Sequence, residues 1–326
     1  RAISNLQFPG GCLIIYGDRQ IGKSSFKNQL INILTNNSVL IKREKINVED
    51  FSKTPICIAL QSASNFKDVR GLLAQLIISE EEFSLYHFFP DVFAEMSISN
   101  IKEKTREWNL NFYGISRKSI TKNEFVDERK EIKGKGNDIV FDFFITLINK
   151  ILELHNDKEL IIFIDEFDLL EDKKGMGELM KLLPDVHFVI VGIAETYTQL
   201  VLDHLSAQHK LAGNNIKLPY WSNEEIREIF KKAKQFYYHK IEFDESFLER
   251  VYEDAGGLPG YAHLLGSHAL KIFQENNEKL VIDSVIYDQA IQRIFNLDLY
   301  DIKDNLDQEN FAELIEIMKG RSKVKS

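Results

Sequence analysis

The sequence predicts an α/β protein, in which a parallel sheet is covered by helices on both faces and is followed by a small helical domain. Over residues 1–218, short apolar runs of strand length alternate with segments of helical spacing. Two of these runs, at 160–164 and 187–191, are apolar nearly throughout, as parallel strands covered on both faces are. After Pro219 the pattern is helical alone, so the sheet is expected to end near that residue.

The strands of the first part are expected at residues 13–16, 55–60, 160–164, 187–191 and 215–218. Helical spacing between them predicts the connecting helices, as in the segment with Phe26, Leu30, Ile33 and Leu34. The pattern decays between residues 79 and 137, which we interpret as an insertion with one further strand at 110–115. Its aromatic residues are expected to form either a lid-side core or a protein-binding face: Phe83, Tyr86, Phe88, Phe89 and Phe93.

Residues 219–300 are expected to form the small helical domain. A capping box from Ser222 to Glu225 opens its first helix. Further helices are expected near residues 245–253, 261–273 and 283–295, and a C-terminal helix at 305–318 precedes a basic tail within residues 301–326.

Composition limits the classes of partner. The formal net charge of −9 argues against nonspecific coating of nucleic acid, which needs clustered Lys and Arg. Basic residues do gather at 117–135, but interleaved acids favour a solvated mixed-charge loop over a nucleic-acid patch. No apolar run reaches the roughly 18 to 20 residues that cross a bilayer, so no membrane partner is expected. Cys12 and Cys57 lie in apolar runs, which favours a reducing, cytoplasmic location.

Residues 17–24 match the pattern G-x-x-x-x-G-K-[ST] between a predicted strand and a predicted helix, the context of a P-loop. In such a loop, backbone N–H groups face the phosphates, Lys23 reaches the β- and γ-phosphates, and the Ser24 hydroxyl binds Mg²⁺. The motif therefore predicts ATP and Mg²⁺ as cofactors. The candidate nucleotide-binding residues are Gly17, Asp18, Arg19, Gln20, Ile21, Gly22, Lys23, Ser24 and Ser25.

Two carboxylates, Asp165 and Glu166, follow the apolar strand at 160–164, which is a Walker B pattern. Asp165 is expected to hold Mg²⁺ together with Ser24, directly or through water. Glu166 is expected to act as the general base on the attacking water. The alternative interpretation is an acidic helix start, to which we assign Asp168 in either case.

These motifs occur in one order with Val191–Thr196 at the end of the fourth strand and with Gly257-Leu258-Pro259 before a helix. That order resembles the AAA+ superfamily, closest to the origin-recognition-like and STAND-type ATPases of prokaryotes. The resemblance covers nearly the whole chain except the insertion. It implies ATPase activity, a P-loop core with sheet order 5-1-4-3-2 at residues 1–218, and a helical lid at 219–300.

Two positions depart from the pattern that the resemblance implies. Relatives carry a polar sensor of the γ-phosphate at the end of the fourth strand, where this chain has Glu195. A carboxylate would repel the phosphate, so Thr196 is the alternative catalytic candidate. Relatives that assemble offer an arginine finger to a neighbouring subunit, but residues 204–211 contain only His209 and Lys210 as candidate cations.

The lid and the N-terminus supply weaker candidates. The lid helix lacks the sensor arginine of origin-recognition-like proteins, so Tyr261 and His263 become candidates to reach the nucleotide. His263 is equally consistent with an ordinary core histidine. Phe8 and Pro9 precede the first strand, where relatives place residues around the adenine base.

Three functions follow from the resemblance. The first is a slow ATP-driven switch whose lid controls assembly of a homo-oligomer or acts on a protein effector, in antiviral defence or signalling. The second is a nucleic-acid-associated loader or remodeller, for which DNA would be the partner and against which the net charge counts. The third is a nucleotide-binding scaffold without turnover.

Overall fold

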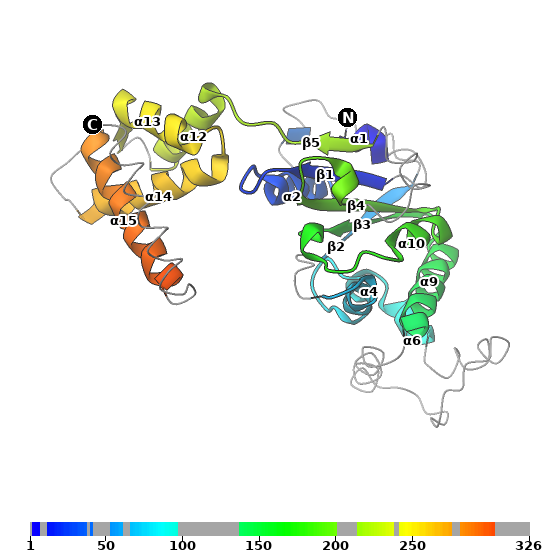
Figure 1. The fold of residues 1–326 in the computed structure, drawn as a ribbon. Helices are drawn as coiled ribbons and strands as arrows, with labels where there is room; N and C mark the ends of the chain where they lie inside the picture. Colours follow the sequence, from blue (N-terminus) through cyan, green and yellow to red (C-terminus); the bar gives the residue numbers. More distant parts are fainter. Residues whose placement is uncertain are drawn as a thin grey trace. The chain divides into compact units, whose positions relative to one another are not determined.

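The computed structural model describes residues 2–6, 12–37, 40–41, 53–60, 66–96, 137–200, 214–237, 241–275 and 281–303, with the backbone alone at 137–139 and 295–303. The chain divides into two compact units, Arg1–Leu218 and Pro219–Ser326 (Figure 1). Each unit has a core of its own.

The first unit is built on a five-stranded sheet in the order β2-β3-β4-β1-β5, which is the predicted order 5-1-4-3-2. Every neighbouring pair in it is parallel. The strands are β1 Cys12–Gly17, β2 Thr54–Leu60, β3 Lys158–Ile164, β4 Val186–Ile193 and β5 Asn215–Lys217. The predicted fold class is therefore confirmed.

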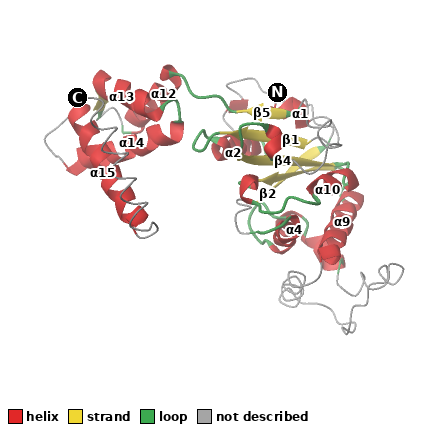
Figure 2. Ribbon diagram, viewed as in Figure 1, coloured by secondary structure: helices red, strands yellow, loops and turns green. Residues whose placement is uncertain are grey.

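Helices cover both faces of this sheet (Figure 2). Side chains alternate between the faces, so Ile161 and Phe163 of β3 pack with α2, while Ile162 and Ile164 pack in the core that includes α4 and α9. The helical elements are α1 Ala2–Leu6, α2 Lys23–Leu34, α4 Val69–Ile78, α5 Leu85–Phe88, α6 Pro90–Glu95, α9 Asn137–Leu154, η2 Phe167–Leu169, α10 Met176–Leu182 and η3 Tyr197–Gln199.

The described beginning of the expected insertion belongs to the core of the first unit. Leu85, Phe89, Val92 and Phe93 of α5, α6 and their junction are buried in the same cluster as α9. Phe89 and Phe93 are therefore core residues of this unit and do not form a binding face. Residues 97–136, with the strand expected at 110–115 and the mixed-charge stretch, lie outside the described residues.

The second unit consists of helices around one core and a small parallel strand pair that the sequence pattern did not predict. Its first helix begins as predicted, because Ser222 Oγ accepts from the Glu225 N–H at 3.3 Å and Glu225 Oε2 accepts from the Ser222 N–H at 2.8 Å. The elements are α12 Asn223–Phe236, β6 Glu242–Phe243, α13 Glu245–Ala255, α14 Pro259–Glu275, β7 Val281–Ile282 and α15 Ser284–Lys303. The helix expected at 305–318 lies outside the described residues.

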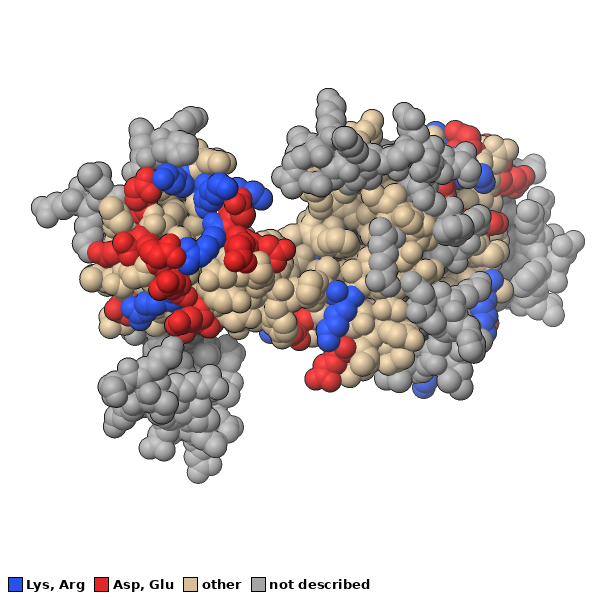
Figure 3. All heavy atoms as spheres, turned by 90° about the horizontal axis from the view of Figure 1, so that it is seen from above, with Lys and Arg blue, Asp and Glu red and all other residues tan. Residues whose placement is uncertain are grey.

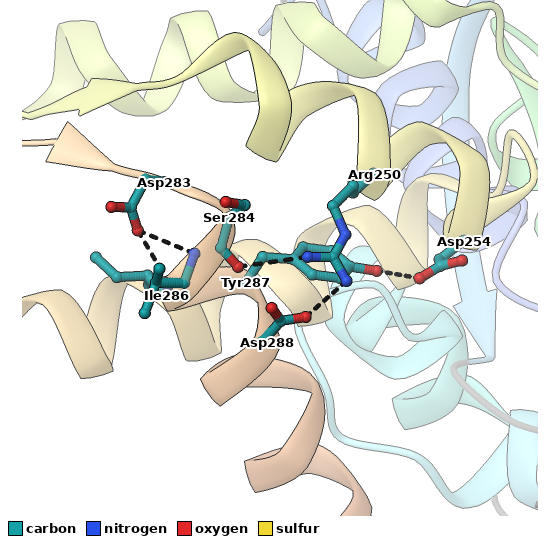
Figure 4. Close-up of polar contacts among 8 residues, drawn as sticks. Arg250, Asp254, Asp283, Ser284, Ile286, Tyr287 and Asp288 are labelled. Atoms are coloured by element: carbon teal, nitrogen blue, oxygen red, sulfur yellow. Dashed lines mark hydrogen bonds and ion pairs between the residues drawn. The ribbon is translucent and has the colours of Figure 1, made fainter. Parts of the chain in front are cut away.

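A polar cluster joins α13 to α15 in this unit (Figure 4). The buried Tyr287 donates its hydroxyl to the carboxylate of Asp254, and the Arg250 guanidinium lies 4.2 Å from the centre of the Tyr287 ring. Arg250 also donates to Asp288 Oδ1 at 2.6 Å. Burial, followed by the Asp254 carboxylate, raises the pKa of Tyr287, so the neutral phenol is the form that the fold stabilises.

Within the described part of the chain, no helix is long and apolar enough to cross a membrane. Cys12 and Cys57 are buried strand residues with free thiols. Burial raises the pKa of each thiol to about 12, so both behave as small apolar core residues.

Candidate nucleotide-binding site

The predicted P-loop connects β1 to α2 in a backbone conformation that suits glycine. Gly17 has φ 149°, Gly22 has φ 98° and Gln20 has φ 63°. A Cβ on Gly17 would also stand 3.2 Å from the Leu218 carbonyl oxygen and 3.3 Å from Ile21 Cγ2. Gly22 is the N-cap of α2 and has no capping side chain, so the loop presents the helix N-terminus to an anion.

Lys23, the first residue of α2, folds back over this loop. Its Nζ donates to the carbonyl oxygens of Gly17 at 3.1 Å and Asp18 at 2.6 Å. Partial burial lowers the pKa of Lys23, against the opposing effect of the carboxylates of Asp168, Asp165 and Asp18. The ammonium therefore lies where phosphate oxygens could replace two carbonyl oxygens as acceptors.

Asp165 and Glu166 directly follow β3, as the Walker B pattern predicts. Asp165 is 3% exposed, and its Oδ1 accepts from the Glu166 N–H at 2.9 Å. Glu166 is exposed and has φ 53°, in the left-handed region that non-glycine residues rarely adopt. Such local strain is concentrated at functional sites, which is consistent with Glu166 as the catalytic base.

Lys27 is part of this site and was not among the predicted residues. Its Nζ lies 2.8 Å from Asp165 Oδ2, and the two side chains are 1% and 5% exposed. Lys27 lies one turn after Lys23 on the buried face of α2, which also carries Leu30, Ile31 and Leu34. A lysine at that position in an apolar helical face was the signal that could have identified it.

Asp168 does more than begin a helix. Its Oδ1 accepts from the Ile193 N–H at 2.8 Å, which ties the segment after β3 to the end of β4. Gly192 makes this approach feasible, since a Cβ there would stand 2.9 Å from Asp168 Oδ1 and 2.8 Å from Leu200 Cδ2. The interpretation of Asp168 as a helix-start residue alone was therefore incomplete.

The two sensor candidates, Glu195 and Thr196, lie just beyond β4 and are both exposed. Gln199 Oε1 accepts from the Glu195 N–H at 2.9 Å and from the Thr196 N–H at 3.4 Å, which fixes the backbone ahead of η3. Thr196 Oγ1 lies 2.9 Å from Thr198 Oγ1. The assignment of Thr196 as the sensor stays a prediction.

The lid candidates, Tyr261 and His263, are both exposed on α14 of the second unit. The alternative interpretation of His263 as a core histidine is wrong, because the buried histidine of α14 is His268. Phe8 and Pro9 lie outside the described residues, as do residues 204–211 with His209 and Lys210.

The donor set of the site fits Mg²⁺. Asp165 and Ser24 offer a carboxylate and a hydroxyl, the oxygen ligands that Mg²⁺ prefers. Across the described ranges, no group of three or more His, Cys, Asp or Glu side chains could hold a metal ion. A usual protein site for Mg²⁺ has one or two carboxylates that act together with substrate phosphates.

No protein-family model matches the chain, and neither does any curated protein. Solved structures do: the ORC2 protein of Aeropyrum pernix, in ADPNP–ADP complexes, matches with a TM-score of 0.50 at 12% identity, over 90% of this chain and 64% of that one. The ORC1 protein of the same organism, in complex with DNA, has a TM-score of 0.49 at 13% identity, over 95% of this chain and 66% of that one. A Walker-type ATPase of Pyrococcus abyssi has a TM-score of 0.45 at 16% identity, over 98% of this chain and 74% of that one.

The chain therefore has a P-loop fold, with a parallel sheet in the predicted order, that is similar to the fold of the ORC2 protein. It spans 64% of the length of the ORC2 structure. At 12% identity the likeness concerns the fold alone.

Proposed function

We propose that this chain binds ATP with Mg²⁺ and hydrolyses it slowly, as a switch that controls assembly of its own copies or acts on a protein effector. One observation carries the proposal: the Asp165 carboxylate lies 2.8 Å from a side chain of α2, the helix that begins with Lys23 and Ser24. The carboxylate that would serve the metal and the loop that would cradle the phosphates thus belong to one site.

In this site the chain's own groups have separate tasks. Lys23 and the start of α2 bind and orient the β- and γ-phosphates. Ser24 and Asp165 would hold Mg²⁺, which when bound neutralises charge on the phosphates. Glu166, exposed beside Asp165, accepts the proton of the attacking water at its carboxylate.

Slow turnover is supported by two features. Glu195 stands where relatives have a neutral polar sensor, and residues 204–211 contain no arginine for a finger. A switch needs contacts that differ between its states, and Tyr261 and His263 stay the proposed nucleotide-sensing residues of the second unit. The resemblance to STAND-type ATPases supports a cytoplasmic role in prokaryotic defence or signalling.

The test compares Glu166→Gln with Glu171→Gln, a matched change at an exposed residue a few positions further on. Glu166→Gln should lower ATP hydrolysis at least about 100-fold and leave ATP binding within about threefold, because the base acts only in the chemical step. Glu171→Gln should change neither. After ATP is added, light scattering should show an assembly that persists in Glu166→Gln and does not persist in Glu171→Gln. Equal hydrolysis by both variants would refute the assignment of Glu166.

The alternative is a nucleic-acid-associated ATPase, a loader or remodeller, which the likeness of fold to the ORC2 protein favours. Charge counts against it, because basic side chains on the second unit alternate with acidic ones (Figure 3). Arg227, Lys234 and Arg293 each pair with a carboxylate, at 2.5 to 2.9 Å. If added duplex DNA stimulates ATP hydrolysis, the result would support the alternative. If the rate of hydrolysis does not change with DNA, it would support the switch.

A further inference from the structure

Lys27 is a buried charged side chain of the site that the proposed mechanism leaves unused. The Lys27 ammonium and the Asp165 carboxylate are 1% and 5% exposed, and they are 2.8 Å apart. Removing two charges from water is costly, and removing either partner of such a pair is more costly still, because the other charge is left buried and uncompensated. The pair is therefore a persistent feature of the fold.

Both oxygens of the Asp165 carboxylate already have a donor. Oδ2 accepts from Lys27 Nζ at 2.8 Å, and Oδ1 accepts from the Glu166 N–H at 2.9 Å. The negative charge that would attract Mg²⁺ is thus neutralised by a cation of the chain itself. A second cation at this carboxylate would also lie close to the Lys27 ammonium, and like charges repel strongly where water is excluded.

We propose that Lys27 is a built-in counter-ion of Asp165 that weakens the coupling between Mg²⁺ and ATP, so that the chain binds ATP with little dependence on Mg²⁺. Lys27 is a positioning residue, since it acts on the metal and the phosphates through Asp165. The inference rests on the proposed function, because it concerns regulation of the same site. It assigns to Lys27 part of the charge neutralisation that Mg²⁺ would otherwise supply.

The experiment measures the dissociation constant of a fluorescent ATP analogue in excess Mg²⁺ and in EDTA, at constant ionic strength. The ratio of the two constants is the coupling between metal and nucleotide. Wild-type protein should give a ratio below about 10. Lys27→Met, which keeps the length of the side chain and removes its charge, should raise that ratio at least about tenfold by freeing the carboxylate for Mg²⁺.

Two further variants separate charge from structure. Lys27→Arg keeps the cation and should keep the wild-type ratio. Lys231→Met is the matched control, because it removes an exposed lysine paired with Glu228 at 2.8 Å in the second unit, and it should leave the ratio unchanged. A loss of packing alone would weaken binding equally with and without Mg²⁺, and would leave the ratio where it was.

The outcomes distinguish this inference from the proposed function. An equal ratio in wild type and Lys27→Met, with ATP bound by both, would overturn the role of Lys27 and leave the proposed function standing. No ATP binding by wild type under either condition would overturn the proposed function itself. If Lys27→Met does not fold, the wild-type ratio decides: a value above about 100 would contradict a built-in counter-ion.

Discussion

Asp168 and Ile193 join the ends of two neighbouring strands, because Asp168 Oδ1 accepts from the Ile193 N–H at 2.8 Å. β3 and β4 lie side by side in the sheet, and this bond links the segments that leave them. Burial lowers the pKa of Lys23, and the same Asp168 carboxylate opposes that shift. One side chain thus connects the Walker B segment, the proposed sensor strand and the P-loop lysine.

Two substitutions of Asp168 should separate the contribution of its hydrogen bond to stability from that of its charge. Asp168→Ala leaves the Ile193 N–H without its acceptor and should lower the free energy of unfolding by about 1–3 kcal/mol. Asp168→Asn keeps an acceptor oxygen and should cost about 1 kcal/mol or less. Urea denaturation measures both. Equal stability of the two variants would show that this hydrogen bond does not hold the strand ends together.

Gly192 should tolerate no side chain, because a Cβ would stand 2.8 Å from Leu200 Cδ2 and 2.9 Å from Asp168 Oδ1. We expect Gly192→Ala to lower the free energy of unfolding by about 2 kcal/mol or more. Gly256→Ala is the control: Gly256 has φ 56°, and a Cβ there would meet no atom of the described residues within 4 Å. Its cost should be about 1 kcal/mol of backbone strain. The reverse ranking in thermal unfolding would contradict the close approach.

Tyr287 should make the stability of the second unit sensitive to alkaline pH. Its pKa is raised in the folded state, so its contribution is complete below the unfolded pKa near 10 and is lost as pH rises through the folded pKa. Unfolding by urea should therefore become easier as pH rises above about 10 in wild type, and less so in Tyr287→Phe. Tyr287→Phe should itself cost about 1–2 kcal/mol at pH 8 through loss of the bond to Asp254.

The readout for Tyr287 can be restricted to its own unit. The chain has two tryptophans, of which Trp221 belongs to the second unit. Fluorescence of Trp221 in a Trp108→Phe background would follow that unit alone. An identical pH dependence in the presence and absence of the Tyr287 hydroxyl would assign the alkaline sensitivity to other groups.

Local patterns predicted the sheet because its strands differ clearly from the segments around them. β3 and β4 are apolar nearly throughout, and each ends within two residues of the predicted boundary. The P-loop and Asp165-Glu166 were recognisable because their chemistry requires particular residue types at a fixed spacing after a strand. The capping box of α12 was recognisable for the same reason.

Features that depend on distant segments could not be predicted in the same way. The pairing of β6 with β7 joins segments of two residues each, too short for any periodicity to appear. The contact between Lys27 and Asp165 spans 138 positions, and the sequence alone gives no distance between α2 and the end of β3. His263 is exposed and His268 is buried on one helix, a difference that depends on which face of α14 meets the core.

The position of β1 in the sheet also limits when the phosphate-binding loop can form during synthesis. β1 pairs with β4 from Phe188 onward and with β5 from Asn215 onward. Because the ribosome delivers the chain from its N-terminus, residues 12–17 emerge long before either neighbouring strand exists. We therefore expect the nascent chain to carry its loop unformed until about residue 217 has left the exit tunnel, so that the proposed ATP ligand could stabilise the fold only after the first unit is complete.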